Sequence, residues 1–358
     1  MERENKLNKN YELWVDYIKV YAAFSVVLLH SAGPLLYKYN ELPHVYWWIG
    51  NLYDSFTRVC VPLFFMISGY LLLSKTEKLS VFFAKRFRRV LVPLVAWSII
   101  YTLWQYYYNS TSLSLTFSSI YGAVLSPVYY HLWFLYAIIG LYFVIPILRV
   151  FINNSSRNMH IYYVMIWFVA VSLIPLIEKC VGTESHFDLL AISGYSGYLV
   201  LGLLLGKCSI SSKMFFWAGM IFVGSGCFTA FATYLLTSMD GGEFSGYFYQ
   251  FQSPNVIIMS STAYVLVKYL VEKSSVACLK KPRIEYIVQL LSGTSFGIYL
   301  VHPIFLELLK HGSLGVTLSC FAGNPIYSIL LTAVTVFLVS FLTSLVIGKI
   351  PLIRRIIF

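Results

Sequence analysis

Tyr11 to Leu36 read YELWVDYIKVYAAFSVVLLHSAGPLL, a mostly apolar run that is long enough to cross a bilayer as a helix. Beyond its first two residues it carries three groups that lipid should exclude: Asp16, Lys19 and His30. At about 100° per residue, Lys19 and His30 lie only about 20° apart around the helix, and Asp16 lies about 40° from His30 on its other side. The run therefore predicts a membrane helix with all three ionisable groups on one face.

These groups also differ in depth. At a rise of about 1.5 Å per residue, His30 lies about 16 Å deeper than Lys19, which is roughly half of a ~30 Å hydrocarbon core. Ionisable side chains inside a membrane helix are costly and usually mark a substrate path or a reaction site. We therefore expect this chain to catalyse a reaction, or to move a substrate, within the bilayer.

The composition predicts an all-α, polytopic membrane protein. Of the 358 residues, 58% are hydrophobic and only 11% are charged, unlike a typical soluble domain. Spanning segments are expected to be helices because lipid offers no hydrogen-bond partners, and the apolar runs lack the alternation of barrel strands. We expect a single membrane-embedded domain, residues 1–358, with about ten spans: 13–36, 51–73, 90–108, 129–149, 159–178, 190–206, 214–237, 255–271, 286–306 and 326–347.

The basic residues predict the orientation. Of the 26 Lys and Arg, only Lys38, Lys179 and Lys310 fall in predicted outer segments, and Lys19 and Arg58 fall within spans. The remaining 21 are cytoplasmic if both termini are cytoplasmic, as the positive-inside rule requires. This topology also explains the net charge of +11, so we predict no nucleic-acid binding.

The cysteines and glycines point to packing. The six cysteines show no metal-ligand spacing, and we predict no metal site. A disulfide between Cys180 and Cys320, both near the predicted outer face, stays open. The spacing of Gly197, Gly202 and Gly206 predicts close packing of their helix against a neighbour.

His30 is the leading catalytic candidate because a neutral imidazole can accept a proton from a hydroxyl and later return it. The alternative is a buried histidine that is hydrogen-bonded across helices. Lys19 and Asp16, three residues apart, can pair at the cytoplasmic end, either as a structural ion pair or as a contact for an anionic donor.

Four further residues within or beside spans are candidates for shaping the acceptor side. Asp54 and Arg58 are four apart and can form an ion pair, and Arg58 lies too deep to face lipid. His131 and His302 fall in the outer half of their spans, as His30 does, so the three histidines could converge. Each could instead be a separate interfacial residue.

A dense basic cluster follows the second span in KLSVFFAKRFRRVLVPL. Topology requires some of this charge, but Lys85, Arg86 and Arg89 exceed that need. Arg86 and Arg89, three apart on a helix, would present a fork to phosphate groups. We therefore predict that Lys85, Arg86 and Arg89 bind the phosphate groups of an anionic donor substrate.

These landmarks, in this order, resemble the bacterial acyltransferase 3 family. The matching pieces cover nearly the whole chain: DYIKVYAAFSVVLLH, RVCVPLFFMISGYLLL, FFAKRFRRVLVPL, YHLWFLYAIIGLY, GYLVLGLLLG and SFGIYLVHP. The chain is most similar to the short members that O-acetylate surface glycans such as enterobacterial common antigen. The family's Arg, ten residues, His motif maps onto Lys19 and His30, with lysine in place of arginine, and its paired arginines map onto Arg86 and Arg89.

The resemblance implies an O-acetyltransferase of the bacterial cytoplasmic membrane. It would move an acyl group from cytoplasmic acetyl-CoA, a substrate and not a bound cofactor, to a hydroxyl of an extracytoplasmic or lipid-linked glycan. His30 would act as general base or as transient acyl carrier. The alternative is a transporter or flippase for a lipid-linked glycan that uses the same charges as a path.

Overall fold

The computed structural model describes residues 12–109, 122, 125–182, 194–273, 279 and 281–351. These residues form helices joined by short turns, and none of them is in a strand. The all-α prediction is therefore confirmed. The α-helices are α1 (Leu13–Ala32), α2 (His44–Thr57), α3 (Cys60–Leu73), α4 (Leu79–Asn109), α6 (Trp133–Asn154), α7 (Arg157–Phe168), α8 (Ile174–Val181), α9 (Ser196–Lys207), α10 (Ser212–Met239), α11 (Pro254–Lys273), α12 (Pro282–Lys310) and α13 (Pro325–Gly348).

Among the described residues, nine helical segments are long and apolar enough to cross a membrane. Each overlaps one of the ten predicted spans, and the predicted span 190–206 corresponds to the twelve-residue α9 and to residues outside the described range. All nine segments pass the predicted bounds at one end or both. The largest differences are at the starts, since segments begin at His44, Leu79 and Tyr247, and the segment from Pro282 continues to Lys310. The chain is therefore a multi-pass membrane protein.

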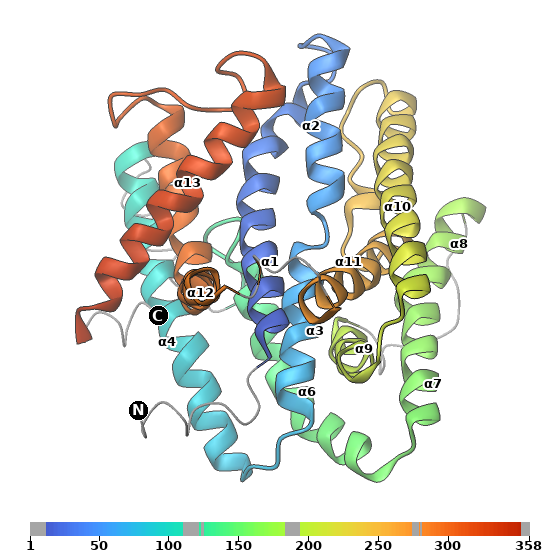
Figure 1. The fold of residues 1–358 in the computed structure, drawn as a ribbon. Coiled ribbons are helices and arrows are strands. Elements are labelled where there is room, and N and C mark those ends of the chain that lie inside the picture. Colours follow the sequence, from blue (N-terminus) through green and yellow to red (C-terminus); the bar gives the residue numbers. More distant parts are fainter. Residues whose placement is uncertain are drawn as a thin grey trace.

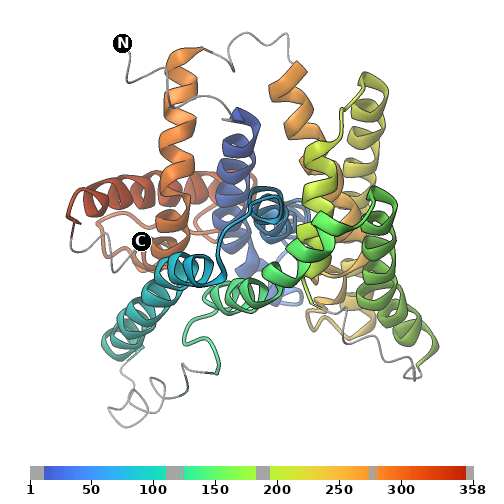
Figure 2. The same cartoon turned by 90° about the horizontal axis from the view of Figure 1, so that it is seen from below.

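Helix α1 lies inside the bundle and is the element around which the others pack. It contacts α2, α3, α11, α12 and α13, and Figures 1 and 2 both show it (dark blue) surrounded by other helices. Buried alanines such as Ala22 and Ala23 allow these neighbours to approach closely. Because α1 is enclosed by protein, its ionisable face meets other helices and not lipid.

Contacts along α1 fix the direction of two neighbours. Ser292, near the start of α12, bonds to Asp16, and His302, further along α12, stacks on His30, so α1 and α12 run parallel. Helix α13 runs antiparallel to α1, because Ile329 near its start packs with Ala32 at the end of α1, whereas Phe337 further along packs on Phe24. The start of α1 and the end of α13 therefore lie on the same side, which the basic residues predict to be cytoplasmic.

Helices α3 and α9 touch through their backbones. A Cβ atom on Gly69 would lie 2.0 Å from the carbonyl oxygen of Leu199, and one on Gly202 would lie 2.0 Å from that of Met66. Gly197 and Gly206 meet the rings of Trp167 and Tyr70 equally closely. The predicted close packing of this glycine helix is thus confirmed. The disulfide that the sequence left open is not formed, because Cys180 and Cys320 are both free.

We predict that Gly202→Ala destabilises the protein while Gly140→Ala does not. The new methyl group at position 202 would overlap backbone atoms of α3, whereas a Cβ on Gly140, on α6, meets nothing within 4 Å. Overpacking of this kind costs about 1–3 kcal/mol. Thermal unfolding of the two detergent-purified variants should show a lower midpoint only for Gly202→Ala. Equal unfolding midpoints for the two variants would contradict the close contact between Gly202 and the backbone of α3.

Candidate active site

Two cavities lie one above the other along α12. The first, which we call the inner cavity because it lies at the predicted cytoplasmic end, has a volume of about 480 Å³. The second, the outer cavity, has a volume of about 550 Å³. Ser292, Ser295 and Tyr299 line the inner cavity, and Leu306, Glu307 and Lys310 line the outer one. These residues recur every three or four positions, so one face of α12 serves both cavities.

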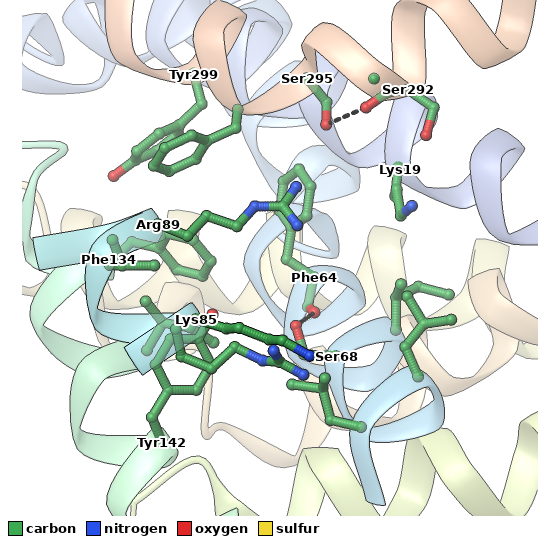
Figure 3. Close-up of a pocket in the computed structure, with 18 of the residues that line it drawn as sticks. Lys19, Phe64, Ser68, Lys85, Arg89, Phe134, Tyr142, Ser292, Ser295 and Tyr299 are labelled. Carbon is green, nitrogen blue, oxygen red and sulfur yellow. Dashed lines mark hydrogen bonds between the residues drawn. The ribbon is translucent and has the colours of Figure 1, made fainter. Parts of the chain in front are cut away.

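The inner cavity is basic. Lys19 approaches it from α1, whereas Lys85 and Arg89 extend into it from the first turns of α4 (Figure 3). Lys75 and Arg86 complete its cationic lining. None of the residues that line it is acidic. A cavity with this lining attracts polyanionic ligands.

Arg86 does not form the open fork with Arg89 that its spacing predicts. Its terminal nitrogen lies 3.0 Å from Oε1 of Glu77, and Arg149 of α6 donates to the same oxygen at 3.0 Å. Arg149 also donates from Nε to the carbonyl of Leu72 at 2.8 Å. Burial opposes ionisation of Glu77, but the hydrogen bond from Arg149 and the charges of Arg86 and Lys85 outweigh it and lower its pKa. Glu77 therefore holds Arg86 at the cavity wall, and Arg89 is left without an acidic partner there.

Lys19 and Asp16 pair as predicted. Their Nζ and Oδ1 atoms are 3.4 Å apart, and Oδ1 also accepts a hydrogen bond from the hydroxyl of Ser292. Asp16 is buried while Lys19 faces the inner cavity. The carboxylate thus anchors an ammonium group that can still reach a ligand.

The outer cavity contains His30. Tyr130, whose ring centroid is 4.8 Å from that of His30, and Glu307 line the same space. Glu307 accepts hydrogen bonds from the hydroxyl of Tyr129 at 2.7 Å and from the indole of Trp104. The lining therefore offers aromatic faces and hydrogen-bonding groups together.

The three histidines converge. The ring centroids of His30 and His302 are 5.4 Å apart with the rings nearly parallel, and those of His131 and His302 are 5.5 Å apart. His131 and His302 are buried, and His131 lies in the turn before α6, not in the span predicted for it. Of these three histidines, His30 alone lines one of the two cavities.

This histidine group connects the linings of the two cavities. Tyr299 lines the inner cavity, and its hydroxyl donates to the backbone carbonyl of His131. The Nδ1 atom of His302 lies 2.7 Å from the carbonyl of Tyr299, and because a carbonyl only accepts, Nδ1 carries the proton. That carbonyl is available because Pro303, four residues on, has no N–H to donate to it. The Nε2 atom of His302 has no partner among the described residues and is left as a proton acceptor.

Asp54 and Arg58 form the predicted pair at the outer cavity. The Nε atom of Arg58 donates to Oδ1 of Asp54 at 2.6 Å, and a terminal nitrogen contacts the same oxygen. The guanidinium carbon lies 4.2 Å from the ring centroid of Tyr249. Both members of the pair line the outer cavity together with His30.

Four residues of the site were not predicted from the sequence: Glu77, Arg149, Tyr299 and Glu307. Glu77 lies in a predicted loop, and Glu307 lies just beyond the predicted end of its span at residue 306. Their roles come from contacts with distant segments, such as Glu77 with Arg149. One signal could have indicated Glu307. Had the helix been predicted to continue to Lys310, Glu307 would have been placed inside it, one turn beyond Pro303.

Comparison with known proteins adds one finding. A family model described as an acyltransferase domain matches residues 12–345, which run from α1 into α13. No curated protein and no solved structure gives a significant match.

We predict that Glu77→Gln lowers the thermal midpoint in a pH-dependent way. Hydrogen bonds to charged groups contribute about 1.5–3 kcal/mol, more than neutral ones, and the variant removes the negative charge that strengthens those that Glu77 accepts. Because the folded-state pKa of Glu77 lies below its ordinary value of 4.5, the stabilisation is complete above that value and is lost as the pH falls through the folded pKa.

The midpoint difference between wild type and Glu77→Gln should therefore be full at neutral pH and vanish in acid. Glu41→Gln, which removes the exposed pair with Lys38, is the control and should change little at any pH. If the midpoint difference between wild type and Glu77→Gln persisted unchanged at low pH, the ionised carboxylate of Glu77 would not be what holds Arg86 and Arg149.

Proposed function

The chain belongs to the acyltransferase 3 family, and we propose that this membrane acyltransferase moves an acetyl group from cytoplasmic acetyl-CoA to a hydroxyl of a glycan. The acceptor is an extracytoplasmic or lipid-linked cell-surface saccharide, and the membrane is the cytoplasmic membrane of a bacterium. The observation that carries the proposal is the pair of cavities on one face of α12, the inner one basic and the outer one lined by His30.

The inner cavity supports a phosphate-bearing donor. Acyl-CoA carries several phosphate charges at one end and an uncharged arm that ends in the thioester. Lys85 and Arg89 at the mouth supply charge-assisted donors for the phosphates, and Lys19 lies deeper in the cavity. The uncharged arm suits the deeper, partly apolar lining around Phe64 and Phe134, and its thioester end would pass Tyr299 to meet His30.

His30 supports the chemistry because it is the one member of the histidine group that lines either of the two cavities. As general base it would take the proton of the acceptor hydroxyl while that oxygen attacks the thioester carbonyl, and it would return the proton to the departing thiolate. As acyl carrier it would instead attack the carbonyl itself and pass the acyl group to the hydroxyl. Asp54, Arg58, His131 and His302 would shape the acceptor side in both routes.

The donor site gives one prediction. Arg89→Gln should raise the Michaelis constant for acetyl-CoA about tenfold, a loss of ~1.4 kcal/mol in binding, because a phosphate contact disappears. The neighbouring Arg88 is exposed but does not line the cavity, so Arg88→Gln is a control with the same change in topological charge. Equal Michaelis constants for acetyl-CoA in the two variants would indicate that the basic cluster only sets the membrane topology.

His30 gives the test of the function itself. Purified protein, labelled acetyl-CoA and de-O-acetylated surface glycan from the host should yield free thiol and labelled glycan. Because positioned proton transfer contributes about 10²- to 10⁴-fold, His30→Gln should lose turnover on that scale at unchanged expression. His44→Gln, at an exposed histidine, should keep wild-type turnover.

Wild-type protein that binds acetyl-CoA but releases no thiol would overturn the acyltransferase assignment to this substrate pair. Movement of unmodified glycan across reconstituted vesicles would then favour the transporter. Full turnover of His30→Gln would make the histidine structural.

A further inference from the structure

Arg58 lies at a break in the middle of a membrane-spanning segment. Helices α2 and α3 together form the span His44–Leu73, but Arg58 and Val59 between them form a turn that belongs to neither α-helix. Pro62 explains the position of the break, because it has no N–H for the carbonyl of Arg58, four residues earlier, and its ring crowds that carbonyl. The sequence thus forces a turn where a cationic side chain is deep in the protein.

Local contacts hold the guanidinium of Arg58 in place. Asp54, whose side chain is 1% exposed, binds it from one edge, and the ring of Tyr249 lies 4.2 Å from the guanidinium carbon. Tyr249 is itself fixed by hydrogen bonds to Asn51 and Ser55. The orientation of Arg58 is therefore set before any ligand binds.

The contacts leave part of the guanidinium available. An arginine has five N–H donors, and those of Arg58 that bind Asp54 converge on a single oxygen, Oδ1. The other donors belong to a side chain that is 16% exposed and lines the outer cavity beside His30. A donor group with a fixed orientation thus shares a cavity with the proposed base.

We propose that Arg58 is a further catalytic residue, whose free N–H groups stabilise the oxyanion formed on the acyl carbonyl during transfer. This inference rests on the proposed function. The acceptor oxygen bonds to the carbonyl carbon as its proton passes to His30, and the carbonyl electron pair moves to oxygen. The carbon–sulfur bond then breaks, the carbonyl re-forms, and the thiolate takes the proton from His30.

The Asp54 partner makes such a role compatible with the membrane. An unpaired guanidinium in the bundle would be costly, whereas the pair has no net charge. Donors that are already oriented in a site of low dielectric stabilise a developing oxyanion without reorganising. Asp54 is then a positioning residue that holds Arg58, and Arg58 contacts the reacting oxygen.

The test keeps the buried pair neutral. In the double variant Asp54→Asn/Arg58→Gln two amides replace the two charges, so no carboxylate is left unpaired. Loss of one oxyanion donor typically lowers kcat about 10²- to 10³-fold, and we expect that loss with the acetyl-CoA Kd and the Michaelis constant for de-O-acetylated host glycan within threefold of wild type. Lys38→Gln/Glu41→Gln, which removes a pair that does not line the cavity, should keep wild-type kcat.

Arg58→Lys is the second variant. It keeps a positive charge beside Asp54, so that no buried carboxylate is left unpaired and the protein is expected to fold. This variant should lose at least about tenfold in kcat, since an ammonium group on a flexible stem lacks the planar fork that holds the guanidinium donors in fixed directions. Wild-type kcat in either folded Arg58 variant overturns the oxyanion role, as does a rise in the glycan Michaelis constant alone. If wild-type protein transfers no acetyl group, the proposed function fails and this inference fails with it.

Discussion

A bilayer offers no water to a charged side chain, so the ionisable groups inside this bundle depend on partners from distant helices. Lys268 of α11 is buried and donates to the carbonyls at the end of α9, including Cys208 at 2.9 Å. Arg149 of α6 ties α6 to the end of α3 through Leu72 and to Glu77. Such pairs fix the helices at defined depths, because moving one would leave a charge without a partner.

The groups that face the cavities differ from these fixed pairs. Lys19, Arg89 and His30 each lie where a ligand could complete their contacts. Asp16 and Tyr130 contact Lys19 and His30 and restrict their positions, and Glu77 holds Arg86 beside Arg89. The fold thus divides its charges into a set that holds the scaffold and a set that stays available. Such a division is expected of a protein that handles an anionic donor within a membrane.

The sequence was sufficient for features that depend on one helix. Apolar length predicted the spans, and angular spacing placed Asp16, Lys19 and His30 on one face. Spacing also predicted the Asp54–Arg58 pair. It was not sufficient where a distant residue competes: Glu77 binds Arg86 and so removes it from the predicted fork with Arg89. No local pattern in the sequence indicates that Arg149 joins the same carboxylate.

Two prolines show how local chemistry can still determine the centre of the site. In a regular helix the carbonyls of Arg58 and Tyr299 would accept from residues 62 and 303, and both of those are proline. At Pro62 the consequence is a turn that places Arg58 beside the outer cavity. At Pro303 the helix continues, and the freed carbonyl instead fixes the proton of His302 on Nδ1. Both defects lie where a packed bundle can satisfy the backbone, which lipid could not do. The breaks in hydrogen bonding thus coincide with the groups that the proposed chemistry requires.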